Sequence, residues 1–244
     1  MRNVAFITGA SSGIGAGTAR LMALRGWDVA LHYGTNRAGA AAVAQDCAAR
    51  GARAVPLSAD LADPSAVPRL FEAFDAAFPR LDAMVVNAGI VDVPARVEDM
   101  TAERLVRMFT VNTVAAILCA GQAARRMLPA GSGVVVLLSS VAARLGAGGQ
   151  YADYAASKAA LDTLAKGLSD EVAGRGLRVV SLRPGVIDTE IHAKGGNPDR
   201  AARLAPAIPM QRPGTVAEVA EAIRWLIEDA TYVTGTTIDV TGGR

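Results

Sequence analysis

Short runs of aliphatic residues alternate along the chain with longer segments whose apolar positions recur every three to four residues. The aliphatic runs lie at residues 4–8, 28–33, 53–58, 82–86, 133–139, 177–182 and 236–240. The segments with helical periodicity lie near residues 14–25, 37–50, 64–78, 102–127, 153–174 and 215–228. This alternation predicts a parallel β-sheet of seven strands with helices packed on both of its faces.

The strand patterns contain few polar residues, and residues 134–138 are all valine or leucine. Strands that are buried on both faces have this composition. No internal repeat, low-complexity tract or interdomain linker interrupts the series. Residues 1–244 are therefore predicted to form one doubly wound α/β domain.

Residues 183–214 break the alternation, because they hold five prolines and the pair Gly195-Gly196. A connection of this length is uncommon inside a compact domain, and long loops are usually functional. Within it, residues 199–205 have a short helix-like pattern.

The composition is that of a compact globular protein, with 51% hydrophobic and 5% aromatic residues. The 25 basic and 23 acidic residues give a formal net charge of +2, without a basic stripe with interleaved aromatics, so no nucleic-acid partner is expected. The apolar runs are shorter than the roughly 18–20 residues of a membrane span. Because a strand pattern begins already at Val4, we expect a cytoplasmic protein with no membrane partner.

Cys47 and Cys119 lie on separate helical segments without a Cys-x-x-Cys spacing, so we expect buried, reduced thiols. The two histidines, His32 and His192, are far apart in the sequence. No metal site is expected from this arrangement.

A glycine-rich turn follows the first strand pattern directly. Its candidate phosphate-binding residues are Gly9, Ser11, Ser12, Gly13, Ile14 and Gly15. Glycines permit a tight turn and close approach to the main chain, and the helix that follows offers free N–H groups to a pyrophosphate. The spacing G-x-x-x-G-x-G differs from the G-x-G-x-x-G of the usual dinucleotide fingerprint. Alone, the motif is also compatible with a strand-to-helix turn that binds no ligand.

Tyr154 and Lys158 lie four residues apart at the start of a helical segment, so their side chains are expected on one helix face. A phenol has an ordinary pKa near 10, and a nearby cation lowers that pKa toward the range useful for proton transfer. Lys158 is placed to supply this charge. A Tyr-x-x-x-Lys pair by itself also occurs on ordinary helix surfaces.

With these motifs, the sequence resembles the short-chain dehydrogenase/reductase family over its whole length, in its short single-domain branch. Asn87-Ala88-Gly89 follows the fourth strand pattern and Arg183-Pro184-Gly185 follows the sixth, as in that family. The chain is most similar to bacterial sugar-dehydrogenase-like and 3-oxoacyl-carrier-protein-reductase-like members. The resemblance implies a Rossmann fold whose dinucleotide lies across the carboxyl ends of the strands, at the point where the strand order reverses.

The resemblance also implies the roles of individual residues. The catalytic residues implied are Asn112, Ser140, Tyr154 and Lys158. The cofactor-binding residues implied, besides the glycine-rich turn, are Asp60, Leu61, Asn87, Ala88, Gly89, Tyr154, Lys158, Pro184, Gly185, Ile187 and Thr189. The implied reaction is hydride transfer between a nicotinamide and a carbonyl or secondary alcohol, with Tyr154 as general acid/base and Ser140 steadying the developing charge.

Several of these residues have alternative interpretations. Ser139 and Ser140 are adjacent and should point in opposite directions, and family alignment favours Ser140. Tyr151 is expected to be a wall of the substrate pocket or plain packing, because no lysine follows it four residues later. By analogy, Asn112 holds a helix distortion and a water leading to Lys158, but it also fits a satisfied core amide.

The residues at the end of the second strand pattern indicate whether the protein prefers NAD(H) or NADP(H). Enzymes of this architecture that prefer NAD usually carry an acidic residue there, and this chain has Tyr33. The next residues include Asn36 and Arg37, whose amide and guanidinium can hold a 2′-phosphate. NADP(H) is therefore the expected cofactor and NAD(H) the alternative. Two observations favour the alternative: Arg37 also fits a solvated residue that begins a helix, and Ser12 occupies a position where many NADP-dependent relatives carry Arg or Lys.

Together these residues predict an NAD(P)-dependent oxidoreductase acting on a small-molecule carbonyl or alcohol. The alternative is a catalytically silent dinucleotide sensor of the same fold, although such proteins lose the tyrosine or the lysine. Residues 187–213 are expected to form a substrate lid, in which His192 either contacts substrate or is solvated. A homotetramer is implied by the resemblance.

Overall fold

The computed structural model describes residues 2–189, 195–197 and 199–244. Seven parallel strands form one sheet, in the order β3-β2-β1-β4-β5-β6-β7. They are β1 (Val4–Ile7), β2 (Asp28–Tyr33), β3 (Ala54–Ser58), β4 (Ala83–Val86), β5 (Gly133–Leu138), β6 (Leu177–Pro184) and β7 (Thr236–Val240). The predicted seven-stranded parallel sheet is confirmed, and each strand ends within one or two residues of its prediction.

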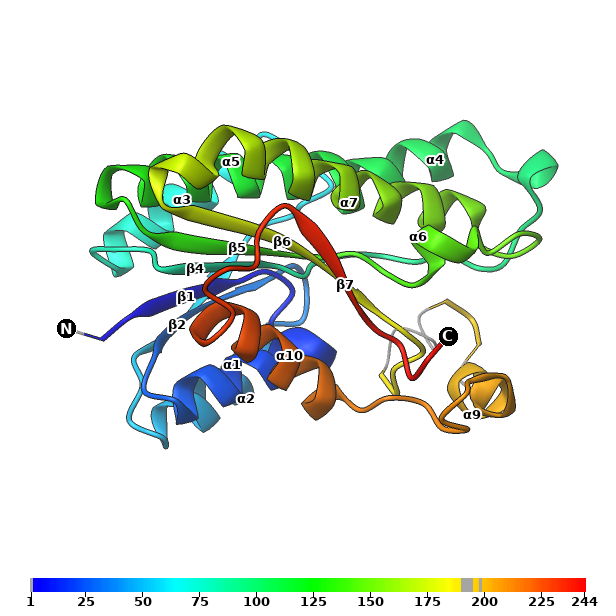
Figure 1. Cartoon of the computed structure of the whole chain (residues 1–244), viewed down its shortest axis with the longest axis horizontal. Coiled ribbons are helices and arrows are strands. Elements are labelled where there is room, and N and C mark those ends of the chain that lie inside the picture. Colours follow the sequence, from blue (N-terminus) through cyan, green and yellow to red (C-terminus); the bar gives the residue numbers. More distant parts are fainter. Residues whose placement is uncertain (1, 190–194, 198) are drawn as a thin grey trace.

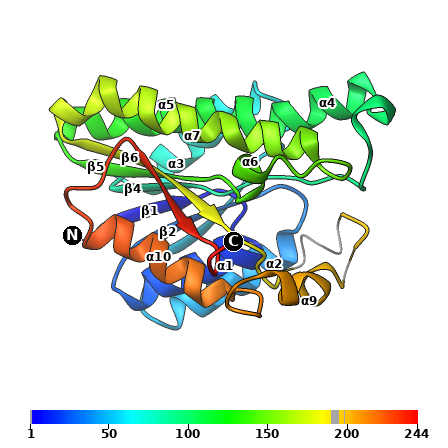
Figure 2. The same cartoon turned by 45° about the vertical axis from the view of Figure 1, so that its right-hand side comes forward.

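Helices cover both faces of the sheet (Figures 1 and 2). One layer contains α1 (Gly13–Leu24), α2 (Arg37–Ala48) and α10 (Val216–Glu228), and the other contains α3 (Ala66–Ala77), α5 (Ala115–Met127) and α7 (Ala152–Val172). Each layer buries its own apolar core against the sheet. Strand residues alternate between the two cores, because successive side chains of a strand point to opposite faces.

An aromatic cluster occupies the core under α3. The rings of Phe6 and Phe74 stack with their centroids 5.0 Å apart, and Phe71 meets Phe6 edge-on at 5.2 Å. The opposite core is aliphatic and includes Met22 and Leu31. Cys47 and Cys119 are buried in different cores, where desolvation raises their thiol pKa values to about 11 and about 12. Both cysteines are therefore unreactive core residues, as expected.

The segment predicted as one helix over 102–127 is divided by a π-helical turn, Thr110–Val114, which separates α4 (Ala102–Phe109) from α5. The combined run, Ala102–Ala130, is long and apolar enough to span a membrane by length and composition, with a mean hydropathy of 1.3 in its most apolar window. This corrects the expectation that every apolar run is too short. Core helices pass the same test, and α5 buries its small side chains against the sheet.

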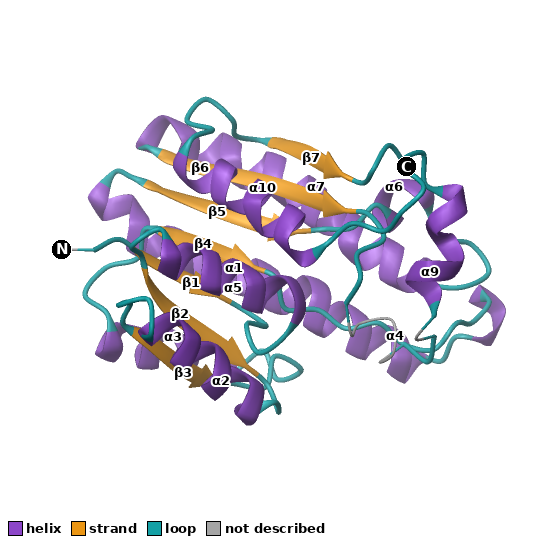
Figure 3. Ribbon diagram, turned by 90° about the horizontal axis from the view of Figure 1, so that it is seen from below, coloured by secondary structure: helices purple, strands orange, loops and turns teal. Residues whose placement is uncertain are grey.

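Two short helices flank the carboxyl ends of the strands, α6 (Ala142–Leu145) and α9 (Arg200–Leu204). The helix-like pattern near 199–205 corresponds to α9, whereas α6 was not anticipated. In Figure 3 the strands point toward the end of the molecule where α6 and α9 lie. The strand order reverses between β1 and β4, so the loops after these two strands diverge and leave a crevice at this end.

Candidate active site

The glycine-rich turn has the backbone that its sequence predicts. Gly9 has a φ of +65°, which L-amino acids with a side chain rarely adopt. A Cβ on Gly15 would lie 2.4 Å from the Gly9 carbonyl oxygen, so only glycine lets α1 begin this close to the turn. Ser12 is the N-cap of α1, and its side chain makes no capping hydrogen bond within the described residues. The first N–H groups of α1 thus remain open to an anion.

Side chains on neighbouring strands hold this turn in place. The Thr8 hydroxyl accepts hydrogen bonds from the Asn87 and Ala88 N–H groups, at 2.9 and 3.0 Å. In return, the Asn87 side-chain amide donates to the Thr8 and Gly9 carbonyls, at 2.8 and 3.1 Å. Both N–H groups of the Asn87 amide are used in this way, so this side chain shapes the cofactor turn from behind.

His32 is a site residue that the sequence analysis considered only as a metal ligand. Its Nδ1 accepts a hydrogen bond from the Gly9 N–H at 3.1 Å, and its Nε2 lies 3.1 Å from the Ala59 carbonyl oxygen. The ring is buried, and desolvation lowers its pKa from the ordinary 6.5, with a smaller opposing effect of the Ala59 carbonyl. A neutral ring with Nε2–H makes both contacts, and it ties the glycine-rich turn to the end of β3.

Tyr154 and Lys158 project from the first turns of α7, with the Lys158 Nζ 6.0 Å from the centre of the Tyr154 ring. The Lys158 ammonium donates a 2.6 Å hydrogen bond to the Leu138 carbonyl at the end of β5. Burial lowers the pKa of Lys158 to about 8, while the Asp162 carboxylate acts in the opposite direction. The two side chains thus share one helix face and meet the carboxyl end of the sheet, as predicted.

The acidity of Tyr154 differs from the expectation. Desolvation raises its pKa above the ordinary 10, and two smaller effects lower it: a hydrogen bond with Ser140 and the charge of Arg200. Burial of the phenol thus outweighs the polar and charged groups around it, and the Lys158 ammonium is directed at the Leu138 carbonyl.

Ser139 and Ser140 point in different directions, as strand alternation requires. The Ser139 hydroxyl donates to the Lys158 carbonyl at 3.0 Å, and this hydrogen bond holds α7 against the sheet. Ser140 follows the last residue of β5 by two positions and hydrogen-bonds with Tyr154. This placement supports the choice of Ser140 over Ser139.

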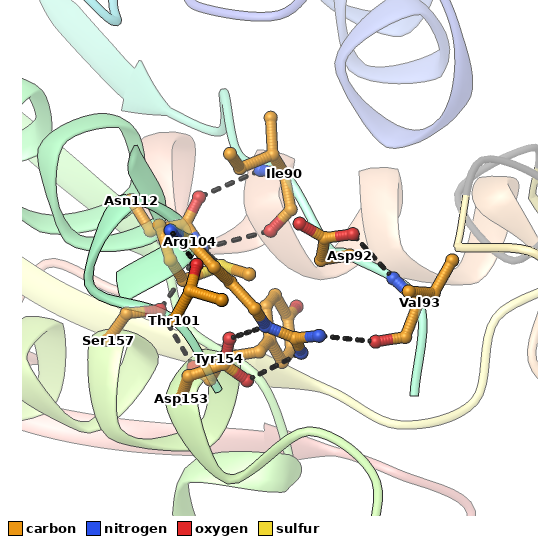
Figure 4. Close-up of polar contacts among 10 residues, drawn as sticks. Ile90, Asp92, Val93, Thr101, Arg104, Asn112, Asp153, Tyr154 and Ser157 are labelled. Carbon is orange, nitrogen blue, oxygen red and sulfur yellow. Dashed lines mark hydrogen bonds and ion pairs between the residues drawn. The ribbon is translucent and has the colours of Figure 1, made fainter. Parts of the chain in front are cut away.

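Asn112 is fully buried in the π-helical turn. Its amide oxygen accepts from the Ile90 N–H at 2.8 Å, and its amide nitrogen donates to the Ile90 carbonyl at 2.9 Å and to the Ser157 hydroxyl at 3.0 Å (Figure 4). The side chain therefore links the segment after β4 to α7. Asn112 thus lies at a helix distortion and is also a satisfied core amide, while the water leading to Lys158 stays a prediction.

A buried ion pair, Arg104 with Asp153, lies directly beside Tyr154 (Figure 4). The Arg104 Nε and Nη2 donate to the two carboxylate oxygens at 2.7 and 3.2 Å, and Nη1 donates to the Val93 carbonyl at 2.7 Å. The Asp153 side chain is fully buried and that of Arg104 is 10% exposed. The pair fastens α4 and the loop after β4 to the start of α7. Nothing in the sequence indicated that Asp153 would pair with Arg104.

The residues predicted to select the cofactor lie at the end of β2. Tyr33 ends the strand half-buried, and Asn36 is the N-cap of α2, with its side chain accepting from the Gly39 N–H at 2.9 Å. Arg37 begins α2 and is exposed, and no described carboxylate pairs with it. Its guanidinium is thus available for a ligand beside the glycine-rich turn.

The remaining predicted cofactor residues line the same end of the sheet. Asp60 is exposed and accepts from the Ala62 N–H at 2.9 Å, and Leu61 beside it is buried. Gly13 lies under Thr189, since a Cβ on Gly13 would be 3.8 Å from the Thr189 side chain. Pro184, Gly185, Ile187 and Thr189 line one cavity together with Gly89.

That cavity has a volume of about 490 Å³ and reaches from the glycine-rich turn to Tyr154. It is lined by Ser140, Tyr154 and Lys158 and by apolar side chains that include Val141, Leu145 and Leu204. Part of the predicted lid, 187–213, lines this cavity through α9. Residues 190–194, which include His192, and residue 198 lie outside the described residues. Tyr151 is buried and lines the cavity, as one of its two interpretations required.

The residues present fit a nicotinamide dinucleotide. The open N–H groups of α1 suit its pyrophosphate, and parallel sheets of this kind bind dinucleotides at the carboxyl ends of the strands, where the strand order reverses. Tyr154 and Ser140 line the cavity at this end, where two hydroxyl groups can hydrogen-bond with one carbonyl oxygen.

Comparison with known protein families gives a match over most of the chain. The family model described as "Enoyl-(Acyl carrier protein) reductase" matches residues 9–244. The "Uncharacterized oxidoreductase YgfF" of Escherichia coli (strain K12) is 46% identical over 245 residues, covering 99% of each chain. The "Cis-4-hydroxycyclohexanecarboxylate dehydrogenase" of Sinomonas cyclohexanicum is 38% identical, covering 98% of this chain and 95% of the relative.

Solved structures agree with these sequence matches. A short-chain type dehydrogenase/reductase from Mycobacterium marinum superposes with a TM-score of 0.92 at 32% identity, covering 99% of this chain and 94% of the other. A 3-ketoacyl-(acyl-carrier-protein) reductase from Brucella melitensis, complexed with NADH, superposes with a TM-score of 0.91 at 30% identity, covering 99% and 98%.

Proposed function

Since this chain belongs to the short-chain dehydrogenase/reductase family and is an oxidoreductase acting on carbonyl or alcohol groups, we propose that Tyr154 is its proton-transferring residue and NADP(H) its preferred cofactor. The observation that carries the proposal is the convergence of Tyr154, Ser140 and Lys158 in one cavity at the carboxyl end of the sheet.

In the direction of reduction, the Tyr154 phenol donates its proton to the carbonyl oxygen, while the Ser140 hydroxyl hydrogen-bonds to the same oxygen as negative charge develops on it. With its pKa raised by burial, the Tyr154 phenol is protonated at neutral pH, and the positive charge of Lys158 beside it is proposed to favour release of the proton. The cofactor, when bound, supplies the hydride. In the direction of oxidation, Tyr154 must accept the proton, and the charges near it lower the cost of its ionised form.

Lys158 is proposed to serve both the phenol and the ribose of the nicotinamide. Its ammonium lies between Tyr154 and the Leu138 carbonyl, and a pKa near 8 leaves it largely charged at neutral pH. Asn112 and the Arg104–Asp153 pair position this part of α7 without touching the reacting atoms. A catalytically silent sensor does not require the complete set of Ser140, Tyr154 and Lys158. We therefore favour an enzymatic function over that of a sensor.

The preference for NADP(H) is supported at the end of β2. Tyr33 brings no negative charge to the position where a carboxylate would repel a 2′-phosphate. Arg37 is exposed beside the glycine-rich turn and has no carboxylate partner among the described residues. Charge-assisted hydrogen bonds from a guanidinium to a phosphate contribute roughly 1.5–3 kcal/mol each.

Steady-state kinetics with NADPH and NADH test this assignment. The kcat/KM for NADPH is expected to exceed that for NADH, and Arg37→Ala should lower it about tenfold or more while changing kcat/KM for NADH little. Arg50→Ala, at the far end of α2, is the matched control. Equal efficiency with the two cofactors, or an Arg37→Ala variant unchanged toward NADPH, would overturn the preference.

The substrate is proposed to be a small molecule with an apolar body, because Val141, Leu145 and Leu204 line the same cavity as the reacting hydroxyls. One relative is named for a hydroxycyclohexanecarboxylate, a ring of a size that suits this cavity. A cytoplasmic location and the closure of residues 187–213 over bound substrate stay predictions.

A further inference from the structure

Arg200 is a lining residue of the cavity that also contains Ser140 and Tyr154. It begins α9, and its guanidinium carbon lies 4.6 Å from the centre of the Tyr151 ring. Its Nη1 also donates to the Gln150 Oε1 at 2.7 Å. The contact with the ring and this hydrogen bond hold the guanidinium beside Tyr151 and Gln150.

Contacts with the described residues leave most of the hydrogen-bonding capacity of Arg200 unused. A guanidinium has five N–H donors, and the contacts just described use one of them. Within the described part of the chain, no carboxylate forms an ion pair with Arg200. Nearby Arg144 is different, since it pairs with Asp239 at 3.5 Å and donates to a main-chain oxygen of Arg244.

Lys158 and Arg200 place positive charge among the described residues that line the cavity, and no aspartate or glutamate is among those residues. The Lys158 ammonium donates a hydrogen bond to the Leu138 carbonyl and lies at the end of the cavity where Tyr154 is located. The charge of Arg200 is felt at the Tyr154 hydroxyl, where it lowers the phenol pKa against the effect of burial. Among the described residues Arg200 therefore has no carboxylate partner, and its guanidinium is placed to bind an anion in this cavity.

We propose that Arg200 binds a carboxylate of the substrate, so that the enzyme acts on oxo acids and hydroxy acids whose carboxylate is separate from the reacting carbon. The inference rests on the proposed function, because it assumes that the reacting carbonyl lies at Ser140 and Tyr154. The apolar side chains of Leu145 and Leu204 then contact the part of the substrate between the two polar ends. Paired N–H groups of one guanidinium match the two oxygens of a carboxylate.

The test compares two aldehydes of nearly equal shape, the anion 4-formylbenzoate and the neutral 4-formylbenzamide. The kcat/KM with reduced cofactor is measured for both in the wild type, in Arg200→Met and in Arg200→Lys. Arg203→Met is the matched control, because Arg203 lies exposed on the same helix and outside the cavity wall.

The wild type is expected to prefer the anion by about tenfold or more. In Arg200→Met the ratio should fall to near one, in Arg200→Lys it should be intermediate, and in Arg203→Met it should equal that of the wild type. Equal kcat/KM for the two aldehydes in the wild type, or a ratio unchanged by both Arg200 substitutions, would overturn the inference and leave the proposed function intact. Reduction of neither aldehyde with NADPH or NADH would count against the proposed function itself and would remove the basis of the inference.

Discussion

His32 shows how one buried side chain can govern the cofactor turn at a distance from the chemistry. Its ring bridges the Gly9 N–H and the Ala59 carbonyl, and both contacts need the neutral form with Nδ1 as acceptor. Protonation of Nδ1 would place two donors face to face at Gly9. The turn therefore depends on a histidine that stays neutral when the protein is folded.

This dependence predicts a pH effect on stability. The pKa of His32 is lowered in the folded protein, so the unfolded chain binds the proton more readily below the ordinary pKa of 6.5. The contribution of His32 is present above pH 6.5, and it is lost progressively as the pH falls below that value. Urea unfolding of the wild type and His32→Gln between pH 8 and pH 5 measures it. The free energy of unfolding should fall more steeply in the wild type, and parallel pH profiles would contradict the argument.

Residue identity and spacing were enough to predict which polar side chains share the cavity, but not their acidity. A spacing of four on a helix places Tyr154 and Lys158 on one face, whereas their pKa values depend on burial by segments far away in the sequence. The roles of His32 and Arg200 escaped prediction for a related reason. Their partners, Ala59 and Tyr151, lie 27 and 49 positions away, and no local pattern marks such pairs.

At the level of elements, the Arg104–Asp153 pair holds α4 against the start of α7. The Asp153 carboxylate is fully buried, so its removal would leave the Arg104 guanidinium buried without its partner. Breaking a buried ion pair from one side typically costs about 3–5 kcal/mol. Asp153→Ala is therefore expected to lower the free energy of unfolding by about that amount, as measured by urea denaturation.

The double variant Arg104→Met with Asp153→Leu removes both charges and separates charge burial from loss of packing. It should recover much of the stability lost in Asp153→Ala, because no unpaired charge is left. The exposed pair Lys166–Asp170 on α7 is the control, and Asp170→Ala should change stability by less than about 1 kcal/mol. A loss in Asp153→Ala no larger than in Asp170→Ala would show that the buried pair does not fasten the two helices.

The π-helical turn marks the limit of prediction from periodicity. Apolar residues recur at helical spacing through residues 102–127, and this pattern cannot reveal one extra residue in a turn. The distortion is visible only once the Asn112 side chain is seen bonding to both polar groups of Ile90. Family resemblance supplied the expectation of a distortion here, and the sequence pattern by itself did not.

At the level of the whole molecule, α4 and α5 carry a row of exposed apolar side chains. They are Leu105, Val106, Val114, Ile117 and Leu118, with Val106 66% exposed. Exposed apolar patches of this kind mark surfaces for association. They support the proposal of a homotetramer in which this face pairs across a two-fold axis.

Light scattering at micromolar concentration should give about four times the 25.0 kDa of one chain. Ile117→Glu is expected to lower the measured mass, because a charge would be buried at the centre of the paired face. Leu24→Glu, at an exposed apolar position on α1, should leave the mass unchanged. A mass near 25 kDa for the wild type would reject the tetramer.

The strand and helix alternation was sufficient to predict the sheet and its two helical layers, because each short aliphatic run has to be buried from both sides. It was insufficient for the segment between β6 and α10. There the chain takes its course from contacts such as the bridge between Ile187 and Gly214 and the packing of α9, which have no periodic signal. The part of the cavity that selects the substrate is built from this segment, which explains why the reaction class was predictable and the substrate was not.

The central claim, that Tyr154 transfers the proton, is tested most directly by the turnover of Tyr154→Phe with reduced cofactor and a carbonyl substrate. The substitution deletes the hydroxyl and keeps the ring, so kcat should fall by about 10²–10⁴-fold while the cofactor binds as before, as followed by its fluorescence. Tyr232→Phe, at a fully exposed tyrosine, should match the wild type. Near-normal turnover in Tyr154→Phe, with cofactor binding intact, would contradict the account.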